Sequence, residues 1–171
     1  MSITLRPAQA GDLMSVGELH YRSRLSAYRD IVPANALTAI SADSMGRWWV
    51  ERWPYERDTH TMTLAERDGR LVGFTYLGPN PELPTIGELC AIHLDPAEQG
   101  RGVGRVLMVD ALEQMRQRGW HRATLWVLAD NKHARRFYER GGWIVDGAER
   151  QGDVGPALTR QLRYVRDLPQ P

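Results

Sequence analysis

The sequence predicts an α/β protein with one mixed sheet of about seven strands, flanked by about four helices. Strands and helices alternate between residues 86 and 165, which is typical of parallel pairing. The Asp68-Gly69 turn lies between two apolar segments and predicts an antiparallel hairpin. A length of 171 residues suits one domain with a buried core. We therefore expect residues 1–171 to form a single domain in which both kinds of pairing occur.

The first half of the chain predicts a strand, then helices, then the hairpin. Ile3 and Leu5 alternate with polar neighbours, which predicts a short strand that ends at Pro7. Asp12 predicts the cap of a helix that runs towards Tyr28. The next expected elements are a short helix that begins at Pro33, a helix over residues 43–56, a strand that contains Met62 and Leu64, and a strand over residues 71–77.

The second half predicts a regular alternation, because apolar runs typical of buried strands are separated by helices with one apolar face. In order, we expect a central strand over residues 86–94, a helix from Gly102 to Gly119, a buried strand over residues 123–128, a helix from Asn131 to Gly141, and strands over residues 143–145 and 158–165. This order places the central strand immediately before a glycine-rich segment.

Composition and charge argue against several classes of function. The 22 basic and 21 acidic residues leave a formal net charge of +1, which gives no support for a nucleic-acid or membrane partner. Cys90 is the single cysteine and the five histidines are scattered, so we expect no disulfide and no metal site. No signal peptide and no membrane-spanning window are visible. We therefore expect a cytoplasmic protein.

The segment from Gln99 to Gly104 predicts an anion site. It joins the central strand to the next helix, where unpaired N–H groups meet the positive end of the helix dipole. Gly100 and Gly102 lack a Cβ atom, so a phosphate can approach the backbone, and Arg101 adds positive charge. A turn that serves only the fold is the alternative. A nucleotide-binding domain for NAD or ATP is a weaker one, because the spacing matches neither a Walker loop nor a dinucleotide-binding turn.

Two segments resemble motifs of the GCN5-related N-acetyltransferase (GNAT) family. Residues 94–104, with the sequence LDPAEQGRGVG, are similar to its Gln/Arg-x-x-Gly-x-Gly/Ala signature. Residues 131–143, with the sequence NKHARRFYERGGW, look like its second motif, Asn-x-x-Ala-x-x-Phe-Tyr-x-x-x-Gly-Phe, with Trp143 in place of the usual Phe. Both motifs occur in the family's order. The resemblance implies the acyl-CoA N-acyltransferase fold, with acetyl-CoA as co-substrate.

The resemblance also implies where acetyl-CoA lies. Its pantetheine arm would enter an opening between the strands over residues 86–94 and 123–128 and contact backbone groups of Ile92, His93 and Leu94. The N–H groups of six consecutive residues would hold the pyrophosphate, namely Gln99, Gly100, Arg101, Gly102, Val103 and Gly104. No metal is implied.

Three residues of the second motif carry further implied contacts. Asn131 would contact the pantetheine arm, and plain N-capping of its helix is compatible with that role. Arg135 or Arg136 would neutralise the 3′-phosphate, unless both are solvated helix charges.

Acetyl transfer to an amine calls for an acid that protonates the leaving thiolate and a base for the amine. The resemblance implies that Tyr138 reaches the sulfur and is the acid, whereas packing beside Phe137 in the core is the alternative. Glu88 lies within an apolar strand and is our candidate base, directly or through a water; an ion pair or an exposed position is the alternative. His20 and His93 are further candidates for the base.

The thiol and the first helices complete the expected site. We expect Cys90 to be buried and inert, because no histidine–acid arrangement accompanies it, so transfer should be direct within a ternary complex. The resemblance implies that the acceptor cleft is walled by Tyr21, Arg24, Tyr28, Trp48, Trp49 and Trp53, although aromatic side chains are more often core.

We therefore expect an N-acetyltransferase that moves an acetyl group from acetyl-CoA to a primary amine of a small molecule, a peptide or a protein N-terminus. A non-catalytic acyl-CoA-binding or sensing module is the alternative, and it would need neither Tyr138 nor Glu88. The identity of the amine and the use of acyl groups other than acetyl stay open. Dimers are frequent among members of the family, so a homodimer is a further expectation.

Overall fold

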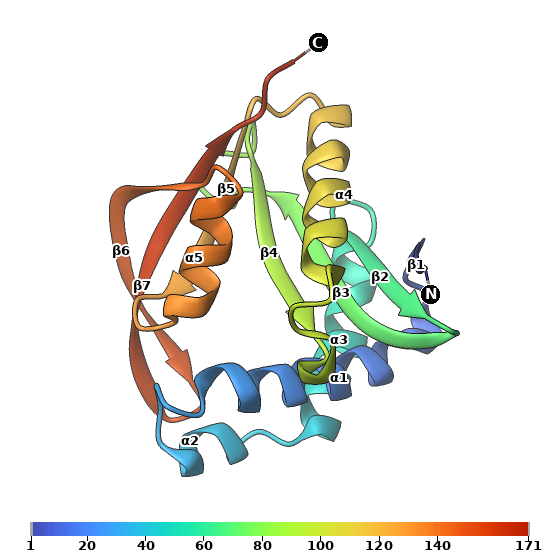
Figure 1. Ribbon diagram of the computed structural model, residues 1–171, viewed down its shortest axis with the longest axis vertical. Helices are drawn as coiled ribbons and strands as arrows, with labels where there is room; N and C mark the ends of the chain where they lie inside the picture. Colours follow the sequence, from blue (N-terminus) through green and yellow to red (C-terminus); the bar gives the residue numbers. More distant parts are fainter. Residues whose placement is uncertain (1, 171) are drawn as a thin grey trace.

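The computed structural model describes residues 2–170, which contain seven strands and five α-helices (Figure 1). The strands are β1 Ile3–Pro7, β2 Thr61–Arg67, β3 Arg70–Pro79, β4 Gly87–Leu94, β5 Arg122–Leu128, β6 Ile144–Val154 and β7 Ala157–Asp167. The helices are α1 Leu13–Tyr28, α2 Ala34–Thr38, α3 Ala42–Glu56, α4 Val103–Gln117 and α5 Lys132–Arg140. All strands join one mixed sheet in the order β1-β2-β3-β4-β5-β7-β6, which confirms the predicted fold class.

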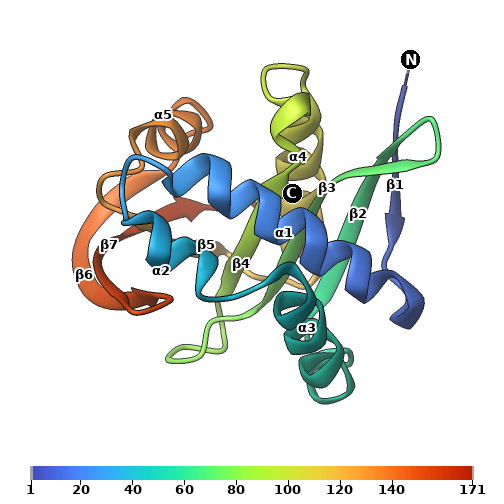
Figure 2. The same cartoon turned by 90° about the horizontal axis from the view of Figure 1, so that it is seen from below.

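Helices cover both faces of the sheet, with α4 and α5 on one face and α1, α2 and α3 on the other (Figures 1 and 2). On the first face, Met115 of α4 belongs to a core that includes Leu125 of β5. On the second, Leu19 of α1 and Trp49 of α3 share a core with Phe74 of β3. Burial of large apolar side chains on two faces stabilises the central strands and fixes the helices over them.

Strand pairing agrees with the sequence in the first half and only partly in the second. The pairs β1–β2, β2–β3 and β3–β4 are antiparallel, as the hairpin predicts. The expected parallel pairing of the second half is right only for β4 and β5. β7 inserts between β5 and β6 and pairs with both in the antiparallel sense, so that β5 and β6 are not neighbours.

The parallel strands β4 and β5 diverge soon after they meet. Their ladder contains two pairs, Gly87 with Ala123 and Glu88 with Thr124. The closed end is fastened by Thr124, whose buried hydroxyl accepts from the side chain of Asn80 at 3.0 Å and donates to the carbonyl of Gly87 at 3.2 Å. Beyond that point β4 has no ladder partner on its β5 side within the described chain, so the sheet is split where we expect the opening.

The β6–β7 hairpin is longer than the sequence predicts. β6 covers Ile144–Val154 rather than residues 143–145, and its residues are mostly exposed. An edge strand with one face in solvent needs no continuous apolar run, and a register shift between Val145 and Glu149 further disguises its period. The sequence pattern therefore shows only the apolar first residues of this strand.

The start of α1 also differs in detail from the expectation. The helix begins at Leu13, and the carboxylate of Asp12 accepts from the N–H of Gln9 at 2.8 Å instead of capping the helix. Further along, Gly17 of α1 lies against Gly46 of α3, where any Cβ atom would approach backbone to 2.2 Å. Glycine is therefore required for α1 and α3 to cross this closely. No helix within residues 2–170 is long and apolar enough to cross a membrane.

Candidate active site

The glycine-rich turn presents free backbone donors at the N-terminus of α4. Gly100 and Gly102 have φ values of +73° and +85°, and a Cβ atom built on either would meet nothing within 4 Å. The N–H of Arg101 donates to the carbonyl of Glu98 at 3.2 Å. In residues 2–170 the N–H groups of Gly102 and Val103 donate to no protein acceptor. Open space, free N–H groups and the helix dipole together form a cradle that suits a phosphate group.

A buried carboxylate fixes this turn from behind. Glu98 is 1% exposed, and its two oxygens meet the guanidinium groups of Arg67 at 3.0 Å and Arg101 at 3.4 Å. Arg101 is thus tied to Glu98, whereas sequence reasoning expects its side chain to add charge at the anion site. The sequence contains no signal for this role of Glu98, because Arg67 lies 31 residues away on β2.

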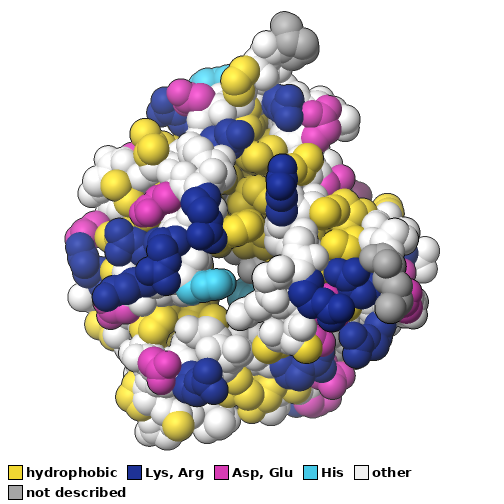
Figure 3. Space-filling view, in the orientation of Figure 1, with side chains coloured by type: hydrophobic (Ala, Val, Ile, Leu, Met, Phe, Trp, Pro, Cys, Tyr) yellow, Lys and Arg dark blue, Asp and Glu magenta, His cyan; other side chains and the backbone are white. Residues whose placement is uncertain are grey.

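Positive charge gathers on both sides of the opening. Figure 3 shows Lys and Arg side chains on either side of a hollow between α5 and α4, with a histidine at its edge. On α5, Arg135 donates to the Tyr164 hydroxyl at 3.0 Å and to the Ala129 carbonyl at 2.9 Å, whereas Arg136 is exposed. Of these two arginines, Arg136 is therefore the one free to meet a ligand phosphate. Asn131 caps α5, and its side chain accepts from the N–H of Ala134 at 3.3 Å.

The cysteine expected to be buried is exposed. β3 and β4 shift register between Tyr76 and Leu77, so that Cys90 is the extra residue of a β-bulge. The bulge turns Cys90 towards a cavity, where it contacts the carbonyl of Glu88 through its thiol at 3.7 Å. The cavity walls shield the thiol from water and, together with the nearby Glu88 charge, raise its pKa to about 12, so Cys90 stays protonated and unreactive near neutral pH.

A cavity of about 360 Å³ lies next to the split in the sheet. It contains eight of the residues singled out from the sequence, namely His20, Arg24, Tyr28, Trp48, Trp49, Glu88, Cys90 and His93. It also contains Arg52, Leu89, Ala91, Trp126, Leu128, Arg150, Asp153, Val154 and Gln161. Tyr21, Trp53 and Tyr138 are not among its lining residues. Four of the six residues expected to wall the acceptor cleft therefore line this cavity, and strands β4, β5, β6 and β7 also contribute to it.

Glu88 lies in the cavity at the closed end of the split. It forms no ion pair within the described chain, so the first alternative for this residue does not apply. Burial raises the pKa of its carboxyl group, and the charge of Arg150 opposes this effect in part. A glutamate with a raised pKa and free oxygens in a cavity is a stronger base than an exposed one and can accept a proton from a substrate.

Tyr138 is 8% exposed and packs within the core between α5 and the sheet. Its ring lies 5.6 Å from Phe137, 6.3 Å from Trp143 and 6.1 Å from Tyr164, measured between centroids. Burial, with a smaller contribution from Tyr28, raises the pKa of its phenol, so the hydroxyl is protonated at neutral pH. In the described residues its hydroxyl has no hydrogen-bond partner.

Two histidines form the floor of the cavity. His20 accepts from the indole N–H of Trp49 at its Nδ1 atom over 3.2 Å, and His93 shares a hydrogen bond with the hydroxyl of Ser23 over 3.0 Å. Burial lowers the pKa of both imidazoles, that of His93 to about 4. Both rings are therefore neutral at pH 7 and leave the floor without positive charge of its own.

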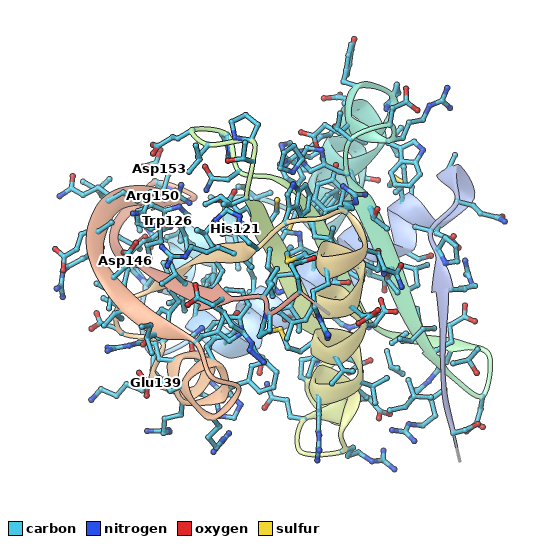
Figure 4. The ribbon with its side chains drawn as sticks, turned by 90° about the horizontal axis from the view of Figure 1, so that it is seen from above. His121, Trp126, Glu139, Asp146, Arg150 and Asp153 are labelled. Carbon is cyan, nitrogen blue, oxygen red and sulfur yellow. The ribbon has the colours of Figure 1, made fainter. Side chains whose placement is uncertain are left out.

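The residues that sequence reasoning missed come from α3 and from the β5–β7–β6 side of the sheet. Figure 4 shows Trp126, Arg150 and Asp153 together on that side. The guanidinium of Arg150 lies 4.3 Å from the ring centroid of Trp126. Which residues of β6 face the cavity depends on how this strand pairs with β7. The sequence does not reveal that pairing, so it contained no signal for these contacts. Within residues 2–170 no group of three potential metal ligands occurs.

A mixed sheet split between two parallel strands, with a glycine turn at a helix N-terminus beside the split, is the architecture of the acyl-CoA N-acyltransferase fold. The family model described as Acetyltransferase (GNAT) family matches residues 26–143, and the chain belongs to this family.

The chain is similar to solved structures over almost its whole length and to curated proteins over a shorter part of its sequence. The PaiA N-acetyltransferase from Thermoplasma acidophilum in complex with coenzyme A superposes with a TM-score of 0.81 at 19% identity, covering 98% of this chain and 99% of that one. A mycothiol acetyltransferase of Thermomonospora curvata is 42% identical over 86 residues, which is 50% of this chain and 28% of that protein. The N-acetyltransferase YuaI of Bacillus subtilis is 25% identical over 131 residues, covering 75% of this chain and 73% of that protein. The chain thus spans less than a third of the length of the mycothiol acetyltransferase.

Proposed function

We propose that this protein is an N-acetyltransferase that moves an acetyl group from acetyl-CoA to a primary amine. The observation that carries the proposal is the cradle at Gly100–Val103 next to a split sheet and a cavity that contains a free carboxylate. Relatives named acetyltransferase and a similar fold in complex with coenzyme A support the same activity.

In this proposal the residues of the chain hold acetyl-CoA at three places. The N–H groups of Gly100, Gly102, Val103 and Gly104 receive the pyrophosphate, because they lie at the positive end of α4 and the space beside Gly100 and Gly102 is open. The backbone of Ile92, His93 and Leu94 pairs with the pantetheine arm, since this edge of β4 lacks a ladder partner in the described sheet. Asn131, at the N-terminus of α5, contacts the arm, and Arg136 of α5 contacts the 3′-phosphate.

Acetyl-CoA supplies an activated acyl group, and two side chains move the protons. Glu88 accepts the proton that the amine loses as its nitrogen bonds to the acetyl carbon, directly or through a water. Tyr138 donates its phenolic proton to the sulfur as the carbon–sulfur bond breaks, and free coenzyme A leaves. The acceptor enters from the cavity, so the transfer occurs in one step within a ternary complex.

The test of this proposal has two readouts on the same protein. Acetyl-CoA should raise the melting temperature by mass action, and a panel of primary amines should release coenzyme A thiol. Stabilisation without transfer to any amine would make the chain an acyl-CoA-binding module. If millimolar acetyl-CoA neither raises the melting temperature nor supports thiol release, both the acetyltransferase and the acyl-CoA-binding module are overturned.

We propose a cytoplasmic location, because the free and exposed thiol of Cys90 suits a reducing compartment.

We also propose a homodimer through the edge strand β6, where the apolar side chains of Ile144 and Val145 are 65% and 49% exposed. Sedimentation of the wild type and of the double variant Ile144→Lys with Val145→Lys tests the dimer. A monomeric wild type contradicts it.

A further inference from the structure

The cavity contains three arginines, and two of them are held by hydrogen bonds and ring contacts to protein groups. The Nε atom of Arg52 donates to Glu56 at 2.6 Å, and its guanidinium lies 4.7 Å from the ring centroid of Trp48. Arg150 donates to the side chain of Gln161 at 2.8 Å and stacks on Trp126. These two guanidinium groups are held in place by carboxylate, amide and aromatic partners.

Arg24 is different. Its Nη2 atom is buried, and in the part of the chain that the structure describes it has no hydrogen-bond partner. The ionisable groups that its charge influences are the neutral imidazoles of His20 and His93 and the phenol of Tyr28, none of which carries a negative charge at neutral pH. A partly buried cation with an unsatisfied donor is costly unless a ligand completes it. The resemblance places Arg24 in the wall of the acceptor cleft, but nothing in the sequence indicates that its guanidinium lacks a partner.

We propose that Arg24 binds a carboxylate of the acceptor, and that the acceptor is therefore a small amino acid-like molecule that carries both an amine and a carboxylate. This inference rests on the proposed acetyltransferase function. The planar guanidinium matches a carboxylate through two parallel hydrogen bonds. Glu88 and Asp153 line the same cavity and supply the opposite charge that an ammonium group needs before it loses its proton.

The size and walls of the cavity support the same class of acceptor. Its volume of about 360 Å³ lies near the lower end of small-molecule sites. Trp48, Trp49 and Trp126 give it aromatic walls, which suit the apolar part of such a molecule. A protein N-terminus carries no carboxylate beside its amine, so this arrangement favours a free amino acid over a protein as acceptor.

The experiment compares each acid with its own amide. The probes are the twenty protein L-amino acids and linear ω-amino acids from β-alanine to 6-aminohexanoate, each with its carboxamide, and a set of neutral amines without a carboxylate. Thiol release is measured for the wild type, Arg24→Gln and Arg24→Lys. We expect kcat/KM of the preferred acid to exceed that of its amide by about 10- to 100-fold, as the loss of a charge-assisted hydrogen bond implies.

The variants separate recognition of the carboxylate from a general loss of activity. Arg24→Gln should remove the preference for the acid mainly through KM, and Arg24→Lys should restore part of it. Arg29→Gln, an exposed residue at the end of the same helix, should retain the full preference. Acetyl-CoA should still stabilise every variant against melting, which shows that each is folded. If Arg24→Gln fails to fold, the wild-type comparison of acid and amide decides alone.

The outcomes that overturn the inference are distinct from those that overturn the function. If neutral amines or amides are acetylated as well as the acids, Arg24 does not read a carboxylate, although the chain is still an acetyltransferase. If Arg24→Gln folds and keeps the preference, another residue binds the carboxylate. If no amine of any kind is acetylated, the proposed function fails and this inference fails with it.

Discussion

The imidazole rings of His20 and His93 lie 4.2 Å apart between centroids, although the first belongs to α1 and the second to β4. Two histidines at this distance cannot both be protonated at low cost, and burial already favours the neutral forms. The pair therefore couples the packing of a helix against the split sheet to pH.

This coupling predicts a loss of stability in acid. An unfolded histidine titrates near 6.5, whereas folded His93 titrates near 4, so the unfolded state binds more protons between these two values. The free energy of unfolding should therefore fall as pH decreases from about 6.5 to about 4, by up to about 1.4 kcal/mol per pH unit for this group. Denaturant titrations of the wild type and His93→Gln would measure it. The exposed His133→Gln variant should keep the wild-type slope, and an unchanged slope in His93→Gln would refute the assignment.

Gly102 of the glycine-rich turn can be compared with Gly69, which lies between β2 and β3 and has a similar backbone geometry. Gly102 and Gly69 have φ values of +85° and +74°, and both face open space. Alanine at either position should cost about 1–2 kcal/mol of stability, because an L-residue is strained there. Only Gly102→Ala should weaken binding of acetyl-CoA, which calorimetry would measure. Equal affinities in the two variants would remove the turn from the binding site.

Removal of the Tyr138 hydroxyl should affect the reaction and leave the fold intact. We expect Tyr138→Phe to lower kcat by about 10²- to 10⁴-fold, with little change in melting temperature. The matched variant Tyr164→Phe should lose stability instead, because its hydroxyl donates to Glu139 at 2.6 Å and accepts from Arg135. Steady-state kinetics and melting curves distinguish the two. A turnover number in Tyr138→Phe that equals the wild type would exclude it as the acid.

The pH dependence of the rate should report Glu88. Because burial raises its pKa, kcat/KM should increase with pH through a value above the ordinary glutamate value of 4.5, as the carboxylate forms. Glu88→Gln should abolish this limb. The exposed Glu82 raises the pKa of Glu88 through its charge, so Glu82→Gln should move the limb to lower pH. A limb that persists in Glu88→Gln would assign the base to another group.

Glu98 should matter for both the turn and the fold. Glu98→Gln leaves Arg67 and Arg101 facing a neutral amide in a buried position, and we expect a loss of about 3–5 kcal/mol together with weaker binding of acetyl-CoA. The same substitution at Glu113, which pairs with Arg116 on the surface of α4, should cost less than about 1 kcal/mol. Similar losses in both variants, measured by chemical denaturation, would contradict the anchoring role.

Local chemistry explains which parts of the site could be predicted. The turn at Gly100–Gly102 and the cap at Asn131 are specified by residues next to one another, so their patterns are visible in one sequence. Arg52 and Arg150 enter the cavity through the way α3 and β6 pack, which depends on contacts between distant residues. The exposure of Cys90 could not be predicted, because the β-bulge has no signature in the sequence. The bulge shifts the register by one residue, and this reverses the direction of the Cys90 side chain.

The short ladder between β4 and β5 has a consequence for solubility. A strand that lacks a neighbour is normally a hazard at the rim of a sheet, where it can recruit another chain. Here that hazard lies inside the molecule, and α1 crosses over the strands on one side of it (Figure 2). A helix thereby covers the unpaired backbone of β4 on this face (Figure 2), in addition to the charged residues that commonly protect an outer strand. An extended molecule of one-strand width can occupy this interior edge, which the surrounding strands hide from other sheets.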